Sequence, residues 1–140
     1  MRPSFLGFTA LMLLLPLGCA STLYLAIDGT SSRPPVEVFD CVRGQIAVLG
    51  YTQTSFNLEK RRITAQKYDW ETRMADTQFR RMIERLFIDV GGAAQGGAHL
   101  TIGAHTFAEL ATQRGPTEVE QSASPAVKAA GQSLLEACGS

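Results

Sequence analysis

The sequence predicts an α+β domain, a four-stranded antiparallel sheet with two helices on one face. Three observations predict this class. Apolar residues recur at helical spacing around residue 40, four segments between residues 51 and 107 have β character, and a second helical stripe lies near the C-terminus. The predicted order is therefore α-β-β-β-β-α.

The first helix is predicted over residues 37–49. Its apolar residues are three and four positions apart, which places them on one helical face, and Gly50 follows where a helix C-cap belongs. Two strands follow, over residues 51–56 and 62–68, because both segments are rich in Thr, aromatic or β-branched residues and a polar turn separates them.

Residues 79–90 and 98–107 are predicted to form an antiparallel hairpin around the glycine-rich loop at 91–97. Alternation along these strands defines an inward face. Its members are Met82, Leu86, Ile88, Val90, Leu100, Ile102 and Ala104. Residues 109–122 contain Gly115-Pro116 and are predicted to be a long loop.

The last helix is predicted to begin at Ser124-Pro125, with serine as the N-cap and proline at the first helical position. It ends at Gly139, and it carries an apolar stripe that includes Leu134 and Cys138.

The first 19 residues are typical of a bacterial signal peptide. Arg2 precedes an apolar run from Phe5 to about Leu15, and Pro16 and Gly18 lead to Cys19. The predicted organisation is a signal peptide at 1–18, a lipid anchor and flexible tether at 19–36, and the α+β domain at 37–140. The tether is predicted because residues 28–36 hold Gly, two Ser and two Pro.

Leu17-Gly18-Cys19 resembles the lipobox of bacterial lipoproteins. This resemblance implies diacylglyceryl attachment to the Cys19 sulfur and acylation, with palmitate for example, of its amine. Ala20 follows the cysteine where an aspartate would favour the inner membrane, so by analogy the anchor lies in the outer membrane and faces the periplasm. Two alternatives stay open: ordinary cleavage near Ala20, or a retained apolar span over residues 5–27. Each of the three places the domain outside the cytoplasm.

Three cysteines are present, and assigning Cys19 to lipid leaves Cys41 and Cys138. Two thiols in an oxidising compartment usually pair. In the predicted topology the start of the first helix is level with the end of the last, so these two residues can come within bonding reach. A disulfide between them is therefore predicted.

Charge and motifs exclude several function classes. Lys+Arg and Asp+Glu both number 13, which gives no electrostatic basis for binding nucleic acid. No spacing typical of a metal site, a cofactor loop or a hydrolase triad is found, so no cofactor, no metal and no enzymatic activity are predicted.

The outward face of the predicted hairpin is the candidate partner surface. It combines apolar and basic side chains, a pattern common at protein interfaces. Its members are Arg81, Ile83, Arg85, Phe87, His99, His105 and Phe107. Two competing interpretations are an ordinary solvated sheet face for the Arg and His residues, and an apolar patch that the predicted loop at 109–122 covers.

Leu49-Gly50-Tyr51, Ile63-Thr64-Ala65 and the final Ser124-Pro125…Cys138 segment resemble small bacterial lipoproteins of uncharacterised function. More loosely, they are similar to the helix-grip domains in the lipoprotein subunit of the outer-membrane β-barrel assembly machine. The resemblance implies a helix-grip-like fold and an envelope address, and it transfers no catalytic residue.

Two functions are therefore expected. The first is a non-catalytic, membrane-anchored envelope lipoprotein that binds an envelope protein or peptidoglycan through its sheet face. The second is a carrier of a small apolar ligand, or an envelope enzyme, with a cavity lined by Met82, Leu86, Leu100 and Ile102.

Overall fold

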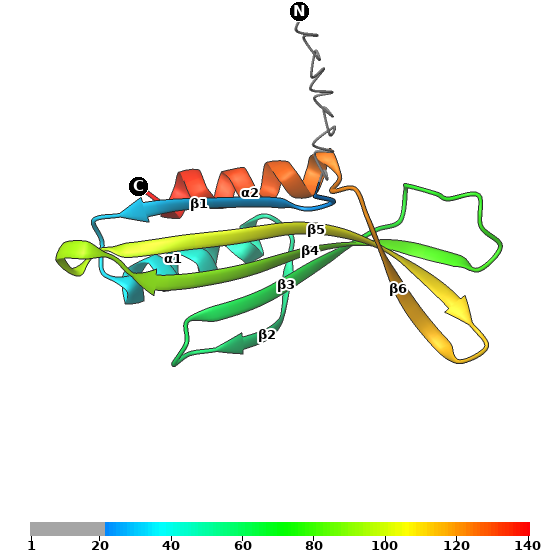
Figure 1. The fold of residues 1–140 in the computed structure, drawn as a ribbon, viewed down its shortest axis with the longest axis horizontal. Helices are drawn as coiled ribbons and strands as arrows, with labels where there is room; N and C mark the ends of the chain where they lie inside the picture. The colour runs from blue at the N-terminus through cyan, green and yellow to red at the C-terminus, as the bar shows by residue number, and fades with distance from the viewer. Residues whose placement is uncertain (1–21) are drawn as a thin grey trace, which may run out of the picture.

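The computed structural model describes residues 22–140, which fold into a single α+β unit (Figure 1). The predicted signal peptide and Cys19 lie outside the described residues. The elements in chain order are β1 (Leu25–Ser31), α1 (Pro35–Val48), β2 (Thr52–Asn57), β3 (Arg62–Asp69), β4 (Phe79–Gly92), the short 3-10 turn Ala94–Gly96, β5 (Ala98–Thr112), β6 (Gly115–Gln121) and α2 (Pro125–Cys138).

The sheet is antiparallel and has six strands, so the α+β class is confirmed and the predicted count of four strands is too small. Its order is β1-β5-β4-β3-β2, and β6 also pairs with β5. β1 and β6 share one edge of the long strand β5: Leu25 is opposite Ala104, and Gln121 is opposite Thr106. The four predicted strands are β2 to β5.

The predicted tether at 19–36 is wrong in its second half, since residues 25–31 form the strand β1. Alternation explains the difference: Leu25 and Ile27 are half-buried against the core, while Ala26 and Asp28 between and after them are exposed. Gly29 lies where a Cβ would come within 2.6 Å of Leu135 Cδ1, so this glycine allows close packing rather than flexibility. Pro35 then occupies the first turn of α1, a position where its missing N–H costs nothing.

The predicted loop at 109–122 is also wrong. β5 continues to Thr112, and β6 returns along it after a tight turn in which Gly115 has φ +106°, a backbone conformation that glycine adopts without strain. Pro116 is tolerated because β6 is an edge strand, where a missing N–H need not break a ladder hydrogen bond. β5 and β6 therefore form a hairpin that extends past the helical layer (Figure 1).

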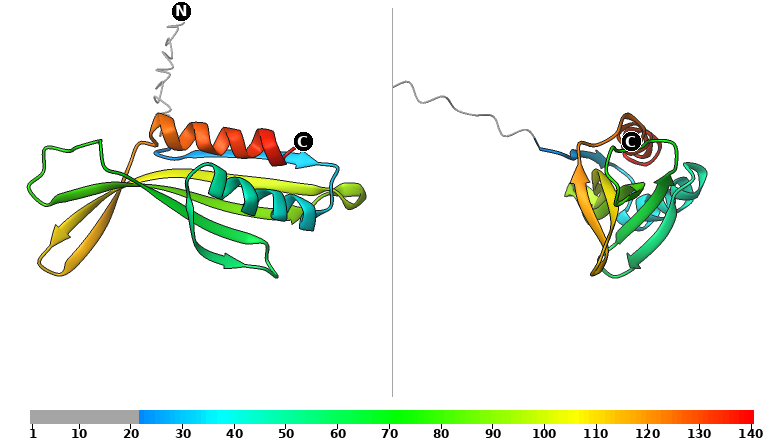
Figure 2. Two further views of the ribbon diagram at one scale, coloured as in Figure 1. Left: turned by 180° about the vertical axis from the view of Figure 1, so that it is seen from behind. Right: turned by 90° about the vertical axis from the view of Figure 1, so that its right-hand side faces the viewer.

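Both helices pack on the same face of the sheet (Figure 2). The predicted inward residues are confirmed, because Leu86, Leu100, Ile102 and Ala104 are fully buried there. Val38, Phe39, Val42 and Ile46 of α1 and Val127, Ala130 and Leu134 of α2 complete this core.

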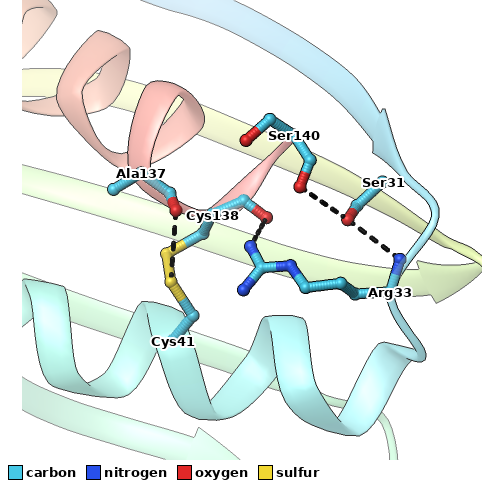
Figure 3. Close-up of a disulfide and its surroundings, with 6 residues drawn as sticks. All are labelled: Ser31, Arg33, Cys41, Ala137, Cys138 and Ser140. Atoms are coloured by element: carbon cyan, nitrogen blue, oxygen red, sulfur yellow. Dashed lines mark hydrogen bonds between the residues drawn. A yellow bond between two sulfur atoms is a disulfide. The ribbon is translucent and has the colours of Figure 1, made fainter.

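The predicted disulfide is present and joins Cys41 of α1 to Cys138 at the end of α2, with their Cα atoms 5.7 Å apart (Figure 3). Arg33 lies beside it and donates a hydrogen bond of 2.9 Å to the carbonyl oxygen of Cys138. A cation at a helix C-terminus satisfies a free carbonyl and favours the helix dipole. The Ser31 hydroxyl also donates to the backbone oxygen of Ser140 at 3.1 Å, so the C-terminal end is fixed to β1.

A buried carboxylate joins the other ends of the two helices. Glu84 of β4 is 5% exposed and accepts hydrogen bonds from the Tyr51 hydroxyl at 2.8 Å and the Ser124 hydroxyl at 2.9 Å. The same Ser124 oxygen accepts from the Val127 N–H at 3.1 Å, which confirms Ser124 as the N-cap. Burial, the Glu84 charge and its hydrogen bond raise the pKa of Tyr51 well above its usual range. This Tyr51–Glu84–Ser124 network fixes the end of α1 and the start of α2 to the sheet.

Candidate functional site

The sheet face opposite the helices carries a band of stacked aromatic and arginine side chains. We call it the aromatic–arginine band, and it extends from the residue before β1 to the residue after β3. Its members are Tyr24, Gln66, Tyr68, Trp70, Arg81, Arg85, Phe87, His105 and Phe107.

His105 is the centre of one half of the band. Its ring stacks on Tyr24 with centroids 4.5 Å apart and on Phe107 with centroids 5.9 Å apart. Phe87 approaches it edge-on at 5.0 Å. The Nδ1 atom of His105 lies 2.7 Å from Glu120 Oε1 of β6. The imidazole is thus held on four sides, and its position is fixed.

Two arginines organise the other half. The Arg85 guanidinium lies 4.8 Å from the centroid of Phe107, donates two hydrogen bonds to Glu118 at 2.7 and 2.9 Å, and donates one to Gln66 at 3.2 Å. The Arg81 guanidinium lies 3.8 Å from the centroid of Tyr68 and 5.4 Å from that of Trp70.

Acidic residues of β5 and β6 neutralise the predicted basic surface. Arg81 pairs with Glu109, whose Oε2 lies 2.9 Å from Arg81 Nε. The aligned hydrogen bond is the one that Arg81 Nη2 donates to Glu109 Oε1 at 3.3 Å. Glu118 pairs with Arg85, and Glu120 with His105. The hydrogen bond and charge of Arg85 hold the pKa of Glu118 below its usual value, and those of Glu118 raise the pKa of Arg85. The face is therefore aromatic and charge-paired rather than cationic.

Two predicted partner residues do not belong to an accessible patch with the others. Ile83 is only 2% exposed, because it lies between Tyr68 and Phe107 on the neighbouring strands and contributes to packing instead. His99 is on the same face but lies six residues along β5 from His105, about 20 Å away. Its Nε2 atom lies 3.4 Å from Oδ2 of Asp28 in β1.

A groove of about 340 Å³ runs beside Phe87 on this outward face. Gly103 lies next to Phe87, and a Cβ there would be 3.0 Å from His105 Nε2, so a larger residue would disturb the stacked ring. Thr64 and Thr101 also line the groove, as do Arg62 and Asp89, which form an exposed ion pair of 2.7 Å. Phe87 is 42% exposed and is its largest apolar side chain.

Sequence reasoning missed four members of the band, Tyr24, Gln66, Tyr68 and Trp70, and the two glutamates of β6 that pair with it. Tyr24 was hidden because it follows the apolar leader, and Glu118 and Glu120 lay in the segment predicted to be a loop. The alternation of Thr117-Glu118-Val119-Glu120 was the available signal for a strand. Tyr68 and Trp70 lie at the end of β3 and the start of a polar connection, and no local pattern indicates that Arg81 packs against both rings.

Within residues 22–140, no group of three or more His, Cys, Asp or Glu side chains is arranged to hold a metal ion. No helix in this part of the chain is long and apolar enough to cross a bilayer. Neither a family model nor a curated protein matches the chain.

The Arg85–Glu118 pair is expected to make the free energy of unfolding decrease at acid pH. The pKa of Glu118 is lowered in the folded state, so the pair stabilises the protein above the usual pKa of a free glutamate, and this contribution is lost as pH falls through the lowered value. We expect Glu118→Gln to reduce stability by less than about 1 kcal/mol at pH 7, because the pair is partly exposed. Urea unfolding at pH 7 and pH 3 measures the effect, and an equal loss at both pH values would contradict it.

Proposed function

We propose that this protein is a non-catalytic envelope lipoprotein that docks a partner protein in the groove beside Phe87. The observation that carries the docking site is an exposed aromatic side chain held next to a groove by a rigid stack. Aromatic anchors with pre-positioned neighbours contribute most of the binding energy at many protein interfaces, because little side-chain entropy is lost on binding. The partner chemistry that fits is an apolar side chain on an envelope protein, with its backbone near the Arg62–Asp89 pair.

The state of the polar side chains supports a non-catalytic role. Arg81, Arg85 and His105 each have a carboxylate partner and an aromatic neighbour, which is typical of side chains that support a surface. The core gives no support to the carrier hypothesis. Leu86, Leu100 and Ile102 are 0% exposed and pack against both helices.

The proposed address is the outer membrane, facing the periplasm, through acyl chains on Cys19. The disulfide supports an oxidising compartment. Two helices on one face of an antiparallel sheet agree with the helix-grip-like arrangement that the resemblance implies, and we keep that relationship as part of the proposal.

Lipidation is tested with labelled palmitate in cells that produce the wild type or Cys19→Ser. We expect label in the wild type and none in the variant, and loss of the variant from the membrane fraction. The Cys41→Ala/Cys138→Ala variant controls for thiol chemistry, and it should retain the label. Equal label in the wild type and Cys19→Ser would refute the anchor.

The docking site is tested by placing a photo-crosslinking amino acid at position 87. Val48 on α1 is 77% exposed and lies on the other side of the sheet, so the same probe there is the matched control. We expect one reproducible crosslinked protein from position 87 and none in common with position 48. Gly103→Val, which fills the groove and displaces the stacked His105 ring beside Phe87, should reduce that product at least tenfold while far-UV circular dichroism stays unchanged. Identical products at both positions would rule the site out.

A further inference from the structure

Trp70 is the only tryptophan in the chain, and 59% of it is exposed at the end of the aromatic–arginine band. Its position is fixed from both sides. The Asp69 carboxylate accepts hydrogen bonds from the backbone N–H groups of Glu71 and Thr72 at 2.9 and 3.1 Å, which holds the turn that follows β3. The Tyr68 ring lies 5.7 Å away, and Arg81 is placed against both rings. An exposed indole is thus held in place by contacts that leave much of it open to solvent.

A notch in the sheet edge opens beside this indole. β2 pairs with β3 only as far as Gln66, which is opposite Thr52, whereas β3 continues to Asp69. The edge of β3 beyond Gln66 therefore has no neighbouring strand on that side. A cleft of about 340 Å³ occupies the notch, and its lining includes Thr52, Thr54, Gln66, Lys67, Tyr68 and Trp70.

The lining combines aromatic surface with hydrogen-bonding groups that are mostly uncharged. The Thr54 hydroxyl donates to the Thr64 carbonyl at 3.1 Å, which leaves its oxygen able to accept. Gln66 donates to the Tyr68 hydroxyl at 3.0 Å, so that phenol retains its own proton for donation outward. Thr52 and Lys67 add an exposed hydroxyl and an exposed ammonium group.

This composition fits a sugar ring. The C–H groups on one face of a pyranose carry partial positive charge and pack on the electron-rich face of an aromatic ring. Its hydroxyl and acetamido groups are neutral and both donate and accept, as do hydroxyl and amide side chains. The notch supplies both kinds of contact within one cleft.

Other ligand classes fit less well. An extended peptide adds along a regular strand edge, but the open edge of β3 in the notch is only the three residues from Lys67 to Asp69, which offer few backbone hydrogen bonds. A nucleic acid needs several cations along its backbone, and Lys67 is the only one in the lining.

We propose that the Trp70 notch is a saccharide-binding site that takes a short neutral or N-acetylated oligosaccharide. It is distinct from the groove beside Phe87 and does not depend on docking there. The sugar could come from the peptidoglycan glycan strand or from a soluble oligosaccharide, and the test distinguishes these sources.

The single tryptophan is a built-in reporter. Full-length protein in detergent micelles is titrated with N-acetylglucosamine oligomers of increasing length, with maltotetraose as a second sugar, and Trp70 emission is recorded. We expect a saturable change in emission, and we expect binding to become tighter as the oligomer becomes longer. Co-sedimentation with purified sacculi, with and without competing soluble oligomer, then identifies the source. Pelleting that the oligomer abolishes indicates the glycan strand, and titration without pelleting indicates a soluble sugar.

Variants separate this site from the rest of the surface. Calorimetry replaces fluorescence for Trp70→Ala, which should lose binding by at least tenfold, and Thr52→Val/Lys67→Met should lose about threefold to tenfold. Leu58→Ser and Val119→Ala, which alter exposed apolar positions outside both proposed sites, should bind as the wild type does. The proposal is overturned if no sugar changes Trp70 emission, if Trp70→Ala binds unchanged, or if an extended peptide saturates the signal instead.

Discussion

Replacing Cys41 and Cys138 together by alanine is expected to lower the free energy of unfolding by about 2–5 kcal/mol. The bond closes a loop with a sequence separation of 97 residues, most of the folded chain. In the chain-entropy model a loop of this size is worth up to about 4.7 kcal/mol, because the crosslink removes many conformations from the unfolded ensemble. A domain of this length has a total stability of roughly 5–15 kcal/mol, so the variant should approach the threshold of folding.

Urea unfolding of the oxidised wild type against the double variant measures this effect. Wild type treated with a reductant should unfold at the midpoint of the variant, which shows that the bond rather than the alanines is responsible. Cys19→Ser is the matched control, and it should leave the midpoint unchanged. A double variant as stable as the oxidised wild type would show that the bond adds nothing.

Removal of the buried Glu84 carboxylate is the second large effect. Glu84→Ala leaves the Tyr51 hydroxyl without its acceptor at a site where Tyr51 is only 6% exposed, and it opens a void between the helices and the sheet. An orphaned buried polar group costs about 1–3 kcal/mol, and we expect a loss in that range or slightly above it. Thermal unfolding followed by circular dichroism is the measurement.

Double variants show whether the loss comes from the hydrogen-bond network. Tyr51→Phe removes the group that Glu84→Ala would orphan, so Tyr51→Phe/Glu84→Ala should be less destabilised than the sum of the single variants. Glu71→Ala is a control for carboxylate removal, since Glu71 is exposed on the connection after β3. Additive losses would contradict coupling between Tyr51 and Glu84.

The parts of the fold that the sequence predicted are those with strong local periodicity. Helical spacing located α1 and α2, alternation located β4 and most of β5, and Ser124-Pro125 marked the start of α2. Topology together with cysteine count also predicted the disulfide. These signals are strong because each residue pattern requires one face to be buried.

β1 and β6 were missed because their amino-acid composition is typical of loops, although both segments form strands. Residues 28–36 are rich in Gly, Ser and Pro, and these residues usually form loops. Gly29 is needed for close packing against Leu135, and the prolines begin a helix, so tertiary contacts decide the structure there. β6 contains Pro116 and two glutamates, and only pairing with the second half of β5 makes it a strand.

The candidate site was predicted in part for the same reason. Alternation placed Arg85, Phe87, His105 and Phe107 on one face, and the structure brings them together. It could not show that Glu118 and Glu120 neutralise that face, since this depends on the missed strand. The packing of Arg81 against both Tyr68 and Trp70 depends on a cross-strand register that no local pattern encodes.

The early start of β1 has a consequence for where an anchored protein can act. Only five residues separate Cys19 from Leu25, so a fully extended connection spans at most about 20 Å. The Ala123 N–H donates to the Leu23 carbonyl at 2.7 Å, which holds the fourth of these residues against the segment that leads into α2. A protein anchored in this way searches a thin layer next to the bilayer, where the effective concentration of a partner in the same membrane is high. A partner farther from the bilayer would have to come to the anchored protein.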